Sequence, residues 1–274
     1  MPIAHQISFA ESPGPNPSRS RPPVVLVHGA GGDSRSWPVE IRRLSDWRVL
    51  AVDLPGHGRS TGRPRQSVAD YCHDLLAFLG ELEIFRAVLV GHSLGAAVVL
   101  QLAKEFPDRL AGLGLISATP HLEAPPLMVE YFSNPLTIPL GIQLFREWAF
   151  CPHTPPTQVA AGLAALHAAR PAVLAGDWQA YANFDFHGSL ERVTTPAWIA
   201  SGAEDRLAPP AGAHYLATCL PDAAVQIIPS AGHMLLVEQP AALASSLQAY
   251  LRRLSPLEQS RMDAGNLPKK ETVT

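Results

Sequence analysis

Residues 87–103 read AVLVGHSLGAAVVLQLA and change their apolar period at a serine that lies between two glycines. Residues 87–90 form a short apolar run typical of a buried strand, and residues 94–103 continue with the spacing of a helix. A strand that turns directly into a helix leaves little room at the turn. Its outer residues must therefore be small, and its central residue takes a strained conformation. The pattern leaves two interpretations of Ser93, a nucleophile held on a strained turn or an ordinary helix-capping serine.

The same alternation of apolar runs and helical patterns extends along most of the chain. Short runs rich in β-branched and apolar residues predict these strands: VVLVHG, RVLAVD, AVLV, LAGLGLISA, PAWIASG and AVQII. Helical spacing follows over residues 67–84, 94–105 and 210–219 and again from about residue 241. Strands that alternate with helices predict an α/β fold, with a parallel sheet covered by helices on both faces.

One region interrupts the alternation. Residues 119–190 contain prolines and scattered aromatic side chains but no strand-like run, which predicts an inserted cap of about four helices. The sequence thus divides into a core of residues 1–118 and 191–255, the cap, and a polar tail over residues 256–274. Residues 11–23 (ESPGPNPSRSRPP) are dense in proline and serine and predict an exposed loop.

Composition narrows the classes of partner. The chain has 274 residues, of which 47% are hydrophobic, enough for one large core, and a net charge of −3. No basic run is longer than a pair, which argues against nucleic acid as the main partner. No apolar run approaches the ~18 residues of a membrane span, and the N-terminus lacks a signal-peptide pattern. Three cysteines without motif spacing favour reduced thiols in a cytoplasmic protein, and no pattern predicts a metal or a cofactor.

A serine nucleophile needs a base, and the base must in turn be oriented by an acid. His233 directly follows the predicted strand AVQII, which places it at the same sheet edge as Ser93. Asp205 lies three residues after Gly202, where another strand ends, and Glu204 is its rival for the role of the acid. The order nucleophile, acid, base is that of hydrolases with the G-x-S-x-G motif.

A glycine-rich loop, residues 28–32 (HGAGG), follows the strand VVLV. The loop lacks the Gly-Lys-Ser/Thr ending of a phosphate-binding loop and the spacing of a dinucleotide fingerprint. We therefore expect the backbone N–H of Ala30, together with that of Leu94, to form an oxyanion hole, and His28 to anchor the loop.

Candidates for substrate contacts are spread over core and cap. We expect Gly29, His92, Trp148 and Trp178 to line the substrate site, the two tryptophans as part of an apolar pocket made by cap aromatics. His121 and His187, at the ends of the insertion, are weaker candidates. For any single aromatic residue, plain packing within the cap accounts for its presence equally well.

The chain resembles the α/β-hydrolase fold family. The matching stretches are LVHGAGGDSRSW, VLAVDLPGHGRS, LVGHSLGAAVVLQLA, SGAEDRLAPP and PSAGHMLLVEQP. The resemblance implies Ser93 as nucleophile, Asp205 as acid, His233 as base, and Ala30 and Leu94 as oxyanion donors. It also implies a mostly parallel eight-stranded sheet with a helical cap inserted after the sixth strand. The sequence departs from the family in the cap, where no subfamily signature is present, and in the long proline-rich loop.

These observations predict a cofactor-free serine hydrolase that cleaves small to medium carboxylic esters, with a small molecule as its partner and no membrane. The same residues serve thioesterase, lactonase, amidase, perhydrolase or carbon–carbon hydrolase chemistry. Alternatives of another class are a ligand-sensing relative with vestigial turnover, and a lyase or synthase that uses Ser93 and His233 for proton transfer.

Overall fold

The computed structural model describes residues 1–13, 21–44, 46–121, 123–187 and 190–265, with side chains up to residue 254. Within these ranges one sheet of eight strands organises the chain, in the order β1-β2-β4-β3-β5-β6-β7-β8. Its strands are β1 (Ile3–Ala4), β2 (Ile7–Ser12), β3 (Val24–Val27), β4 (Val49–Asp53), β5 (Ala87–His92), β6 (Leu110–Ile116), β7 (Ala197–Gly202) and β8 (Ala223–Ile228).

The sheet is parallel except at one edge. β1 pairs antiparallel with β2, which pairs antiparallel with β4, and every later pairing is parallel. The structure thus confirms the predicted α/β fold with a mostly parallel eight-stranded sheet. It also corrects the expected loop over residues 11–23, because Glu11 and Ser12 belong to β2 and pair with β4. Residues 14–20 of that loop lie outside the described residues.

Helices cover both faces of the sheet. Three helices pack against one face of the sheet: α2 (Val68–Glu81), α3 (Leu94–Glu105) and α8 (Pro210–Cys219). Three others pack against the opposite face: α1 (Val39–Arg42), α9 (Leu235–Glu238) and α10 (Pro240–Gly265). Along β3, Val25 and Val27 enter the first layer while Val24 and Leu26 enter the second, as the two-residue period of a strand requires. The short 3-10 turns η1 (Ser34–Ser36) and η2 (Pro107–Arg109) connect these elements.

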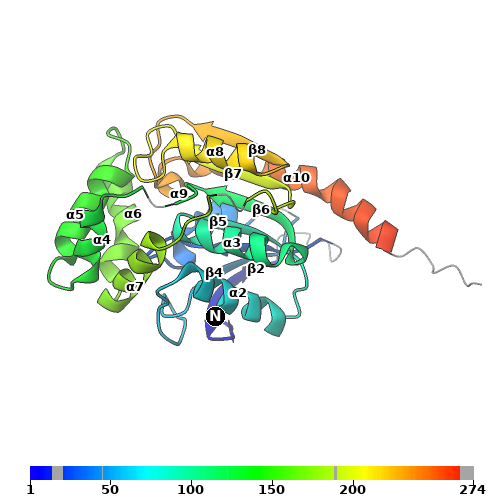
Figure 1. The fold of residues 1–274 in the computed structure, drawn as a ribbon, viewed down its shortest axis with the longest axis horizontal. Helices are drawn as coiled ribbons and strands as arrows, with labels where there is room; N and C mark the ends of the chain where they lie inside the picture. The colour runs from blue at the N-terminus through cyan, green and yellow to red at the C-terminus, as the bar shows by residue number, and fades with distance from the viewer. Residues whose placement is uncertain (14–20, 45, 122, 188–189, 266–274) are drawn as a thin grey trace, which may run out of the picture.

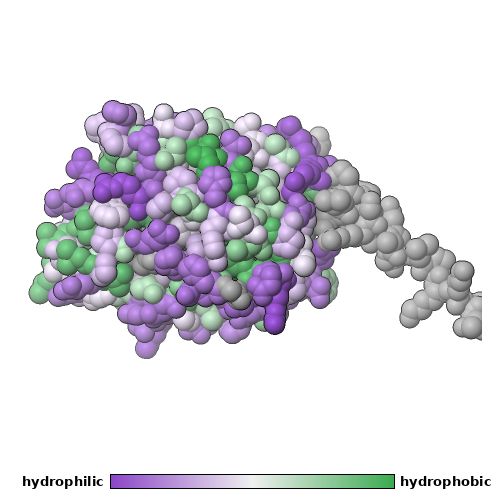
Figure 2. All heavy atoms as spheres, turned by 45° about the horizontal axis from the view of Figure 1, so that its top comes forward, coloured by the Kyte–Doolittle hydropathy of each residue, from purple (hydrophilic) through white to green (hydrophobic). Residues whose placement is uncertain are grey.

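Four helices lie between β6 and β7 in the described chain, the number expected for the insertion. They are α4 (Pro126–Ser133), α5 (Ile138–Ala149), α6 (Pro156–Ala168) and α7 (Pro171–Ala182), and they share a small core of their own. Figure 1 shows them gathered at one end of the molecule. Figure 2 shows apolar surface at that end, and exposed leucines (Leu127, Leu136 and Leu140) belong to α4, α5 and their connection.

The C-terminal helix α10 extends away from the sheet at the other end (Figure 1). It continues to Gly265, so the first residues of the polar tail over 256–274 are helical, whereas residues 266–274 lie outside the described part. Among the described residues no single helix is long and apolar enough to cross a membrane, and the bent pair α6–α7 passes that test by length and composition alone. All three cysteines have free thiols.

Candidate active site

Ser93 occupies the turn between β5 and α3, and its backbone is strained. Its φ of 53° and ψ of −120° lie in a region that residues with a side chain rarely adopt. The flanking glycines permit the turn, because a Cβ on Gly91 would collide with the Gly95 carbonyl and a Cβ on Gly95 with the Val27 carbonyl. Ser93 makes no side-chain cap hydrogen bond to α3, which removes the helix-cap interpretation.

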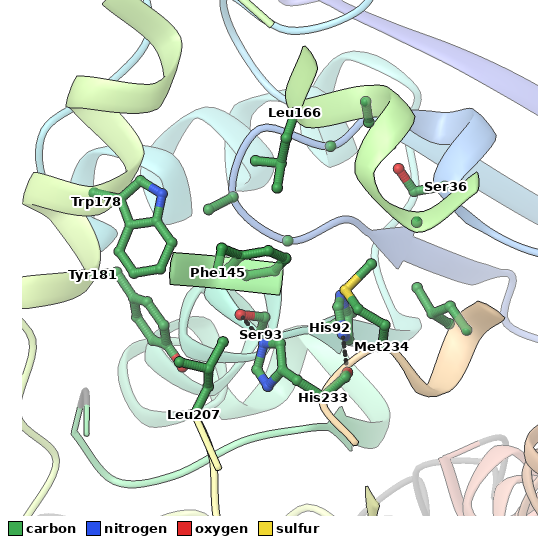
Figure 3. Close-up of a pocket in the computed structure, with 16 residues that line it drawn as sticks. Ser36, His92, Ser93, Phe145, Leu166, Trp178, Tyr181, Leu207, His233 and Met234 are labelled. Atoms are coloured by element: carbon green, nitrogen blue, oxygen red, sulfur yellow. Dashed lines mark hydrogen bonds between the residues drawn. The ribbon is translucent and has the colours of Figure 1, made fainter. Parts of the chain in front are cut away.

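The Ser93 hydroxyl points at the imidazole of His233, as Figure 3 shows. Ser93 Oγ donates to His233 Nε2 over 2.9 Å, and His233 Nδ1 donates to Asp205 Oδ2 over 3.0 Å. Because the carboxylate only accepts, it fixes the proton of the neutral imidazole on Nδ1 and leaves Nε2 free to take a proton from Ser93. All three side chains are buried, so water scarcely competes for these bonds.

Asp205 is itself held in place by the loop that follows β7. Its Oδ1 accepts from the backbone N–H groups of Leu207 at 2.9 Å and Ala208 at 2.8 Å. Glu204, the rival candidate for the acid, is exposed, and its carboxylate instead accepts from the Cys151 thiol at 3.1 Å. The geometry therefore brings Asp205, and not Glu204, to the imidazole.

Both expected oxyanion donors lie beside Ser93. Leu94 begins α3, whose first N–H groups have no partner within the helix, and Ala30 follows β3 on the loop that lines the same cavity. No described residue accepts a hydrogen bond from either N–H. The loop approaches the nucleophile so closely that a Cβ on Gly29 would lie 3.1 Å from Ser93 Cβ. The two N–H groups are thus free to donate to an oxygen of a molecule bound beside Ser93.

Two histidines near Ser93 form hydrogen bonds to the backbone. His92 Nε2 donates to the His233 carbonyl at 3.0 Å, and Ser117 Oγ donates to the same carbonyl at 2.9 Å. Burial, reinforced by the neighbouring His233, lowers the pKa of His92 to about 3, so its ring is neutral. His28 anchors the oxyanion loop as expected, donating to the Gly29 carbonyl and accepting from Leu54 N–H.

A buried carboxylate of the cap contacts that same loop. Asp177 of α7 accepts from Gly31 N–H at 2.7 Å, from the Tyr71 hydroxyl at 2.6 Å and from His57 Nε2 at 2.8 Å. The other His57 nitrogen, Nδ1, donates to the Pro55 carbonyl at 3.1 Å. Because both ring nitrogens face acceptor oxygens, His57 must carry two protons and a positive charge.

The electrostatics of His57 agree with this geometry. Burial alone would lower the pKa of His57, but the charge of Asp177 and its hydrogen bond outweigh that cost and raise it. Next to it, burial and the His57 charge lower the pKa of His28 to about 4, so one ring of this pair is charged and the other neutral.

A second buried carboxylate, Glu238 of α9, fixes the loop that carries the base. Glu238 accepts from Gly232 N–H and from Cys151 N–H, both at 2.8 Å, and from the Thr154 hydroxyl at 2.5 Å. The His233 N–H donates in addition to the Ala149 carbonyl at 2.8 Å. The linker between α5 and α6 of the cap is thereby tied to the base loop.

A small, mostly apolar cavity of about 40 Å³ adjoins Ser93 and His233. Its lining includes Gly29, His92 and Trp178, three of the residues that the sequence suggested for a substrate site, together with Ala30. Figure 3 shows His92 and Trp178 around this cavity. Trp148 is a correction: it does not line the cavity, because its ring packs against the Arg206 guanidinium, whose Cζ lies 4.5 Å from the ring centroid. His121 and His187 pair with each other, 4.9 Å between ring centroids, and do not line the cavity either.

A larger cavity of about 490 Å³ adjoins the first between α6 and η1. The two share the lining residues Ser36, Gly162, Ala165, Met234 and Leu236. The space beside Ser93 and His233 is therefore small, and the larger cavity next to it offers room for a bulkier group. No cluster of described residues has the composition of a metal site.

Sequence reasoning missed several residues of this site. They are Asp177, His57, Tyr71, Glu238 and Tyr181. Their common property is that each acts through a contact between segments far apart in the sequence, for which the chain carries no local signal. Only the aromatic content of the cap pointed toward Tyr181.

Comparison with known proteins gives a consistent result. A family model described as the alpha/beta hydrolase family matches residues 24–246. The acetyltransferase component of the acetoin-cleaving system of Pseudomonas putida is 31% identical over 84% of this chain, which spans only 64% of that relative's length. The pimeloyl-[acyl-carrier protein] methyl ester esterase of Aromatoleum aromaticum is 29% identical over 85% of this chain and 99% of its own. The structure of a thermophilic esterase from Thermogutta terrifontis superposes with a TM-score of 0.79 at 24% identity, covering 90% of this chain and 93% of that one.

Proposed function

Because the chain belongs to the alpha/beta hydrolase family, we propose that it is a serine hydrolase that cleaves carboxylic esters through an acyl-enzyme on Ser93. The observation that carries the proposal is the continuous hydrogen-bond chain from Ser93 through His233 to Asp205, buried beside a cavity. The similarity to a methyl ester esterase along nearly the whole of that protein supports an ester as the substrate.

The first step forms the acyl-enzyme. Ser93 Oγ attacks the ester carbonyl carbon while His233 Nε2 takes the hydroxyl proton, and Asp205 holds the imidazole and stabilises its charged form. The carbonyl electron pair moves to oxygen, which accepts hydrogen bonds from the N–H groups of Ala30 and Leu94. Each such donor contributes about 3 kcal/mol to stabilising the transition state.

Collapse of the tetrahedral intermediate breaks the bond to the alkoxy oxygen, which receives the proton from His233. Water then enters, loses a proton to His233 and attacks the acyl-enzyme. The acid is released and the proton returns to Ser93. These reaction steps need no cofactor, since every proton moves between Ser93, His233, water and substrate.

Substrates of small to medium size fit the two connected cavities. About 40 Å³ beside Ser93 has room for little more than a few waters, whereas the adjoining 490 Å³ accommodates a larger group. We propose that the ester carbonyl is bound in the first cavity and the bulkier half of the substrate in the second. The apolar side chains lining both favour a hydrocarbon-rich substrate.

A fluorophosphonate probe followed by peptide mass mapping tests the nucleophile. We expect label on Ser93 in the wild-type protein, none in Ser93→Ala, and loss of ester hydrolysis in that variant. Full turnover by Ser93→Ala would contradict the assignment. Binding of esters without turnover or labelling would instead favour a ligand-sensing protein.

A panel of p-nitrophenyl esters of varied chain length, with thioesters and lactones, tests the substrate class. We expect esters to give the highest kcat/KM. Thioesters or lactones turned over faster than every ester would move the function to those bonds while leaving the Ser93 mechanism in place.

A further inference from the structure

The Tyr181 hydroxyl is a buried polar group at the reaction centre that lacks a partner. Tyr181 belongs to α7, lines the catalytic cavity and is 3% exposed. Its hydroxyl makes no hydrogen bond to any described residue. Buried hydroxyls are usually paired, and leaving one unpaired costs about 1–3 kcal/mol. A group of this kind inside a substrate cavity suggests that its partner arrives with the substrate.

Aromatic packing fixes the direction of this hydroxyl. The Tyr181 ring stacks on Phe184 with 5.1 Å between centroids and 6° between planes, and it also contacts Trp178. Figure 3 shows the hydroxyl directed toward Ser93 and the His233 ring. In that view the blue loop that follows β3 lies on the opposite side of Ser93. The phenol and the oxyanion loop therefore face a bound ester from two sides.

The nearby side chains leave the Tyr181 proton available. Ser93 Oγ donates to His233, and Thr119 Oγ1 donates to the His121 carbonyl. Burial raises the pKa of Tyr181 and the charge of Asp205 raises it further, and together they outweigh the neighbouring hydroxyls of Ser93 and Thr119, which lower it. The phenol thus stays protonated during turnover and acts as a hydrogen-bond donor, not as a proton-transfer acid.

An ester has two oxygens that develop charge. In the proposed mechanism the carbonyl oxygen accepts hydrogen bonds from Ala30 and Leu94, on the side of Ser93 where the loop after β3 lies. The alkoxy oxygen then lies on the opposite side of Ser93, where Tyr181 is. That oxygen must also approach His233 Nε2, which protonates it as it leaves. Tyr181 is the described lining residue with an unpartnered hydroxyl toward His233.

We propose that the Tyr181 hydroxyl donates a hydrogen bond to the alkoxy oxygen of the scissile ester. The inference rests on the proposed ester hydrolysis at Ser93. As the carbon–oxygen bond breaks, its electron pair goes to the alkoxy oxygen and the proton comes from His233 Nε2. The phenol proton stays on Tyr181 throughout. The hydrogen bond strengthens as negative charge builds up on the leaving oxygen, which makes Tyr181 a catalytic residue specific for oxygen leaving groups.

Replacement of Tyr181 by phenylalanine removes the hydroxyl and keeps the ring. The test measures kcat/KM, which reports acylation, for esters of one acid with p-nitrophenol, phenol, trifluoroethanol and ethanol. We expect little loss for the p-nitrophenyl ester, because its leaving group needs little stabilisation, and a loss rising to about ten- to hundredfold for the ethyl ester. The matching ethyl thioester should lose almost nothing, since sulfur accepts hydrogen bonds weakly. An equal loss for all leaving groups, or no loss for any, overturns the proposal.

Two control variants and one labelling experiment separate a role in catalysis from a role in folding. Tyr181→Phe should melt at the wild-type temperature or above it, because the deleted hydroxyl has no protein partner; a lower melting temperature would show such a partner and contradict the premise. Tyr215→Phe, in the outer helix α8 and away from the cavity, should leave every rate unchanged. Fluorophosphonate labelling of Ser93 in wild type and in Tyr181→Phe tests the nucleophile by itself, so a failure of the ester-hydrolase proposal is distinguishable from a failure of the role of Tyr181.

Discussion

Two buried histidine–aspartate pairs lie in the described part of this protein, and the contacts of one of them suit proton transfer whereas those of the other do not. In both, an imidazole nitrogen donates to a fully buried carboxylate: His233 to Asp205 at 3.0 Å and His57 to Asp177 at 2.8 Å. The pairs differ in what the second nitrogen contacts. His233 Nε2 accepts from the Ser93 hydroxyl, whereas His57 Nδ1 donates to the Pro55 carbonyl.

The second contact decides the chemistry. An imidazole between a carboxylate and a hydroxyl can gain and lose a proton as the hydroxyl reacts. An imidazole between a carboxylate and a carbonyl has no proton to gain, because both its nitrogens already donate. The first pair is thus suited to general base catalysis, and the second is an ion pair that joins the cap helix α7 to the core beside the oxyanion loop. A histidine beside a buried carboxylate is consequently a poor indicator of catalysis until the partner of its other ring nitrogen is known.

Replacing Asp205 by asparagine should break the catalytic pair with the largest effect on rate. The amide would present a donor to His233 Nδ1 and favour the wrong tautomer, while Asn Oδ1 can still accept from Leu207 and Ala208. We expect kcat to fall about 10⁴-fold with little change in melting temperature. Ester hydrolysis and circular dichroism measure the two quantities. Near-normal rates would transfer the role of the acid to Glu204, and Glu204→Gln is the matched control.

The same change at Asp177 should have the opposite profile. Asp177→Asn leaves the His57 charge buried without its counter-charge, so we expect the free energy of unfolding to fall by about 3–5 kcal/mol. Ser93, His233 and Asp205 are left unchanged, so ester hydrolysis should decline far less than in Asp205→Asn. Urea unfolding and initial rates provide the comparison. Asp185→Asn is the control in the same region, because that carboxylate is exposed and pairs with an exposed histidine, and its stability should match the wild type. A rate loss as large as that of Asp205→Asn would mean that Asp177 acts in the chemistry.

The contrast between the pairs also explains what the sequence could predict. Ser93, Asp205 and His233 each lie within a few residues of the carboxyl end of a strand, and the carboxyl ends of parallel strands share one sheet edge. Local patterns therefore sufficed to bring them together. The same reasoning predicted the sheet, its helices and the place of the insertion, because periodicity within a few residues carries that information.

The second pair had no such signal. Asp177 lies 120 residues from His57 and 106 from Tyr71, and it contacts them only because α7 packs against the core. Which aromatic residues of the cap face the cavity is set in the same way, so Trp178 and Trp148 could not be told apart from composition. The N-terminal edge was also missed, since β1 has only 2 residues and proline-rich sequence follows β2.

Loss of the Tyr71 hydroxyl should weaken the structural pair without breaking it. Tyr71→Phe removes one of three hydrogen bonds to Asp177 and also the acceptor of Arg65 N–H, while the ring stays in the core. We expect the free energy of unfolding to fall by about 1–3 kcal/mol, and the rate of ester hydrolysis to stay close to that of the wild type. Thermal and urea unfolding check the size of the loss. Stability equal to that of the wild type would show that the Tyr71 bond to Asp177 contributes nothing net.

The smallest effect is expected from pH, and it concerns the structural pair alone. The folded-state pKa of His57 lies above its ordinary value of 6.5, so the stability from its charged form is complete below that pH. This stability is lost as the pH rises through the folded pKa. The loss is modest, because deprotonation at Nδ1 removes one of two donated hydrogen bonds and leaves Nε2–H on Asp177.

Urea midpoints measured between pH 6.5 and pH 9 test this dependence. Wild-type stability should decline over the range, and in Asp177→Asn the decline should shrink, because the asparagine no longer raises the pKa of His57. The groups that face His57 are His28, Tyr71 and Asp177, and of these His28 is already neutral above its pKa of about 4. His28 therefore titrates below the pH range of this experiment, and its titration does not overlap with that of His57. Parallel pH profiles for wild type and Asp177→Asn would show that His57 is not charged in the folded protein, and the difference between the two histidine–aspartate pairs would then lie in position alone.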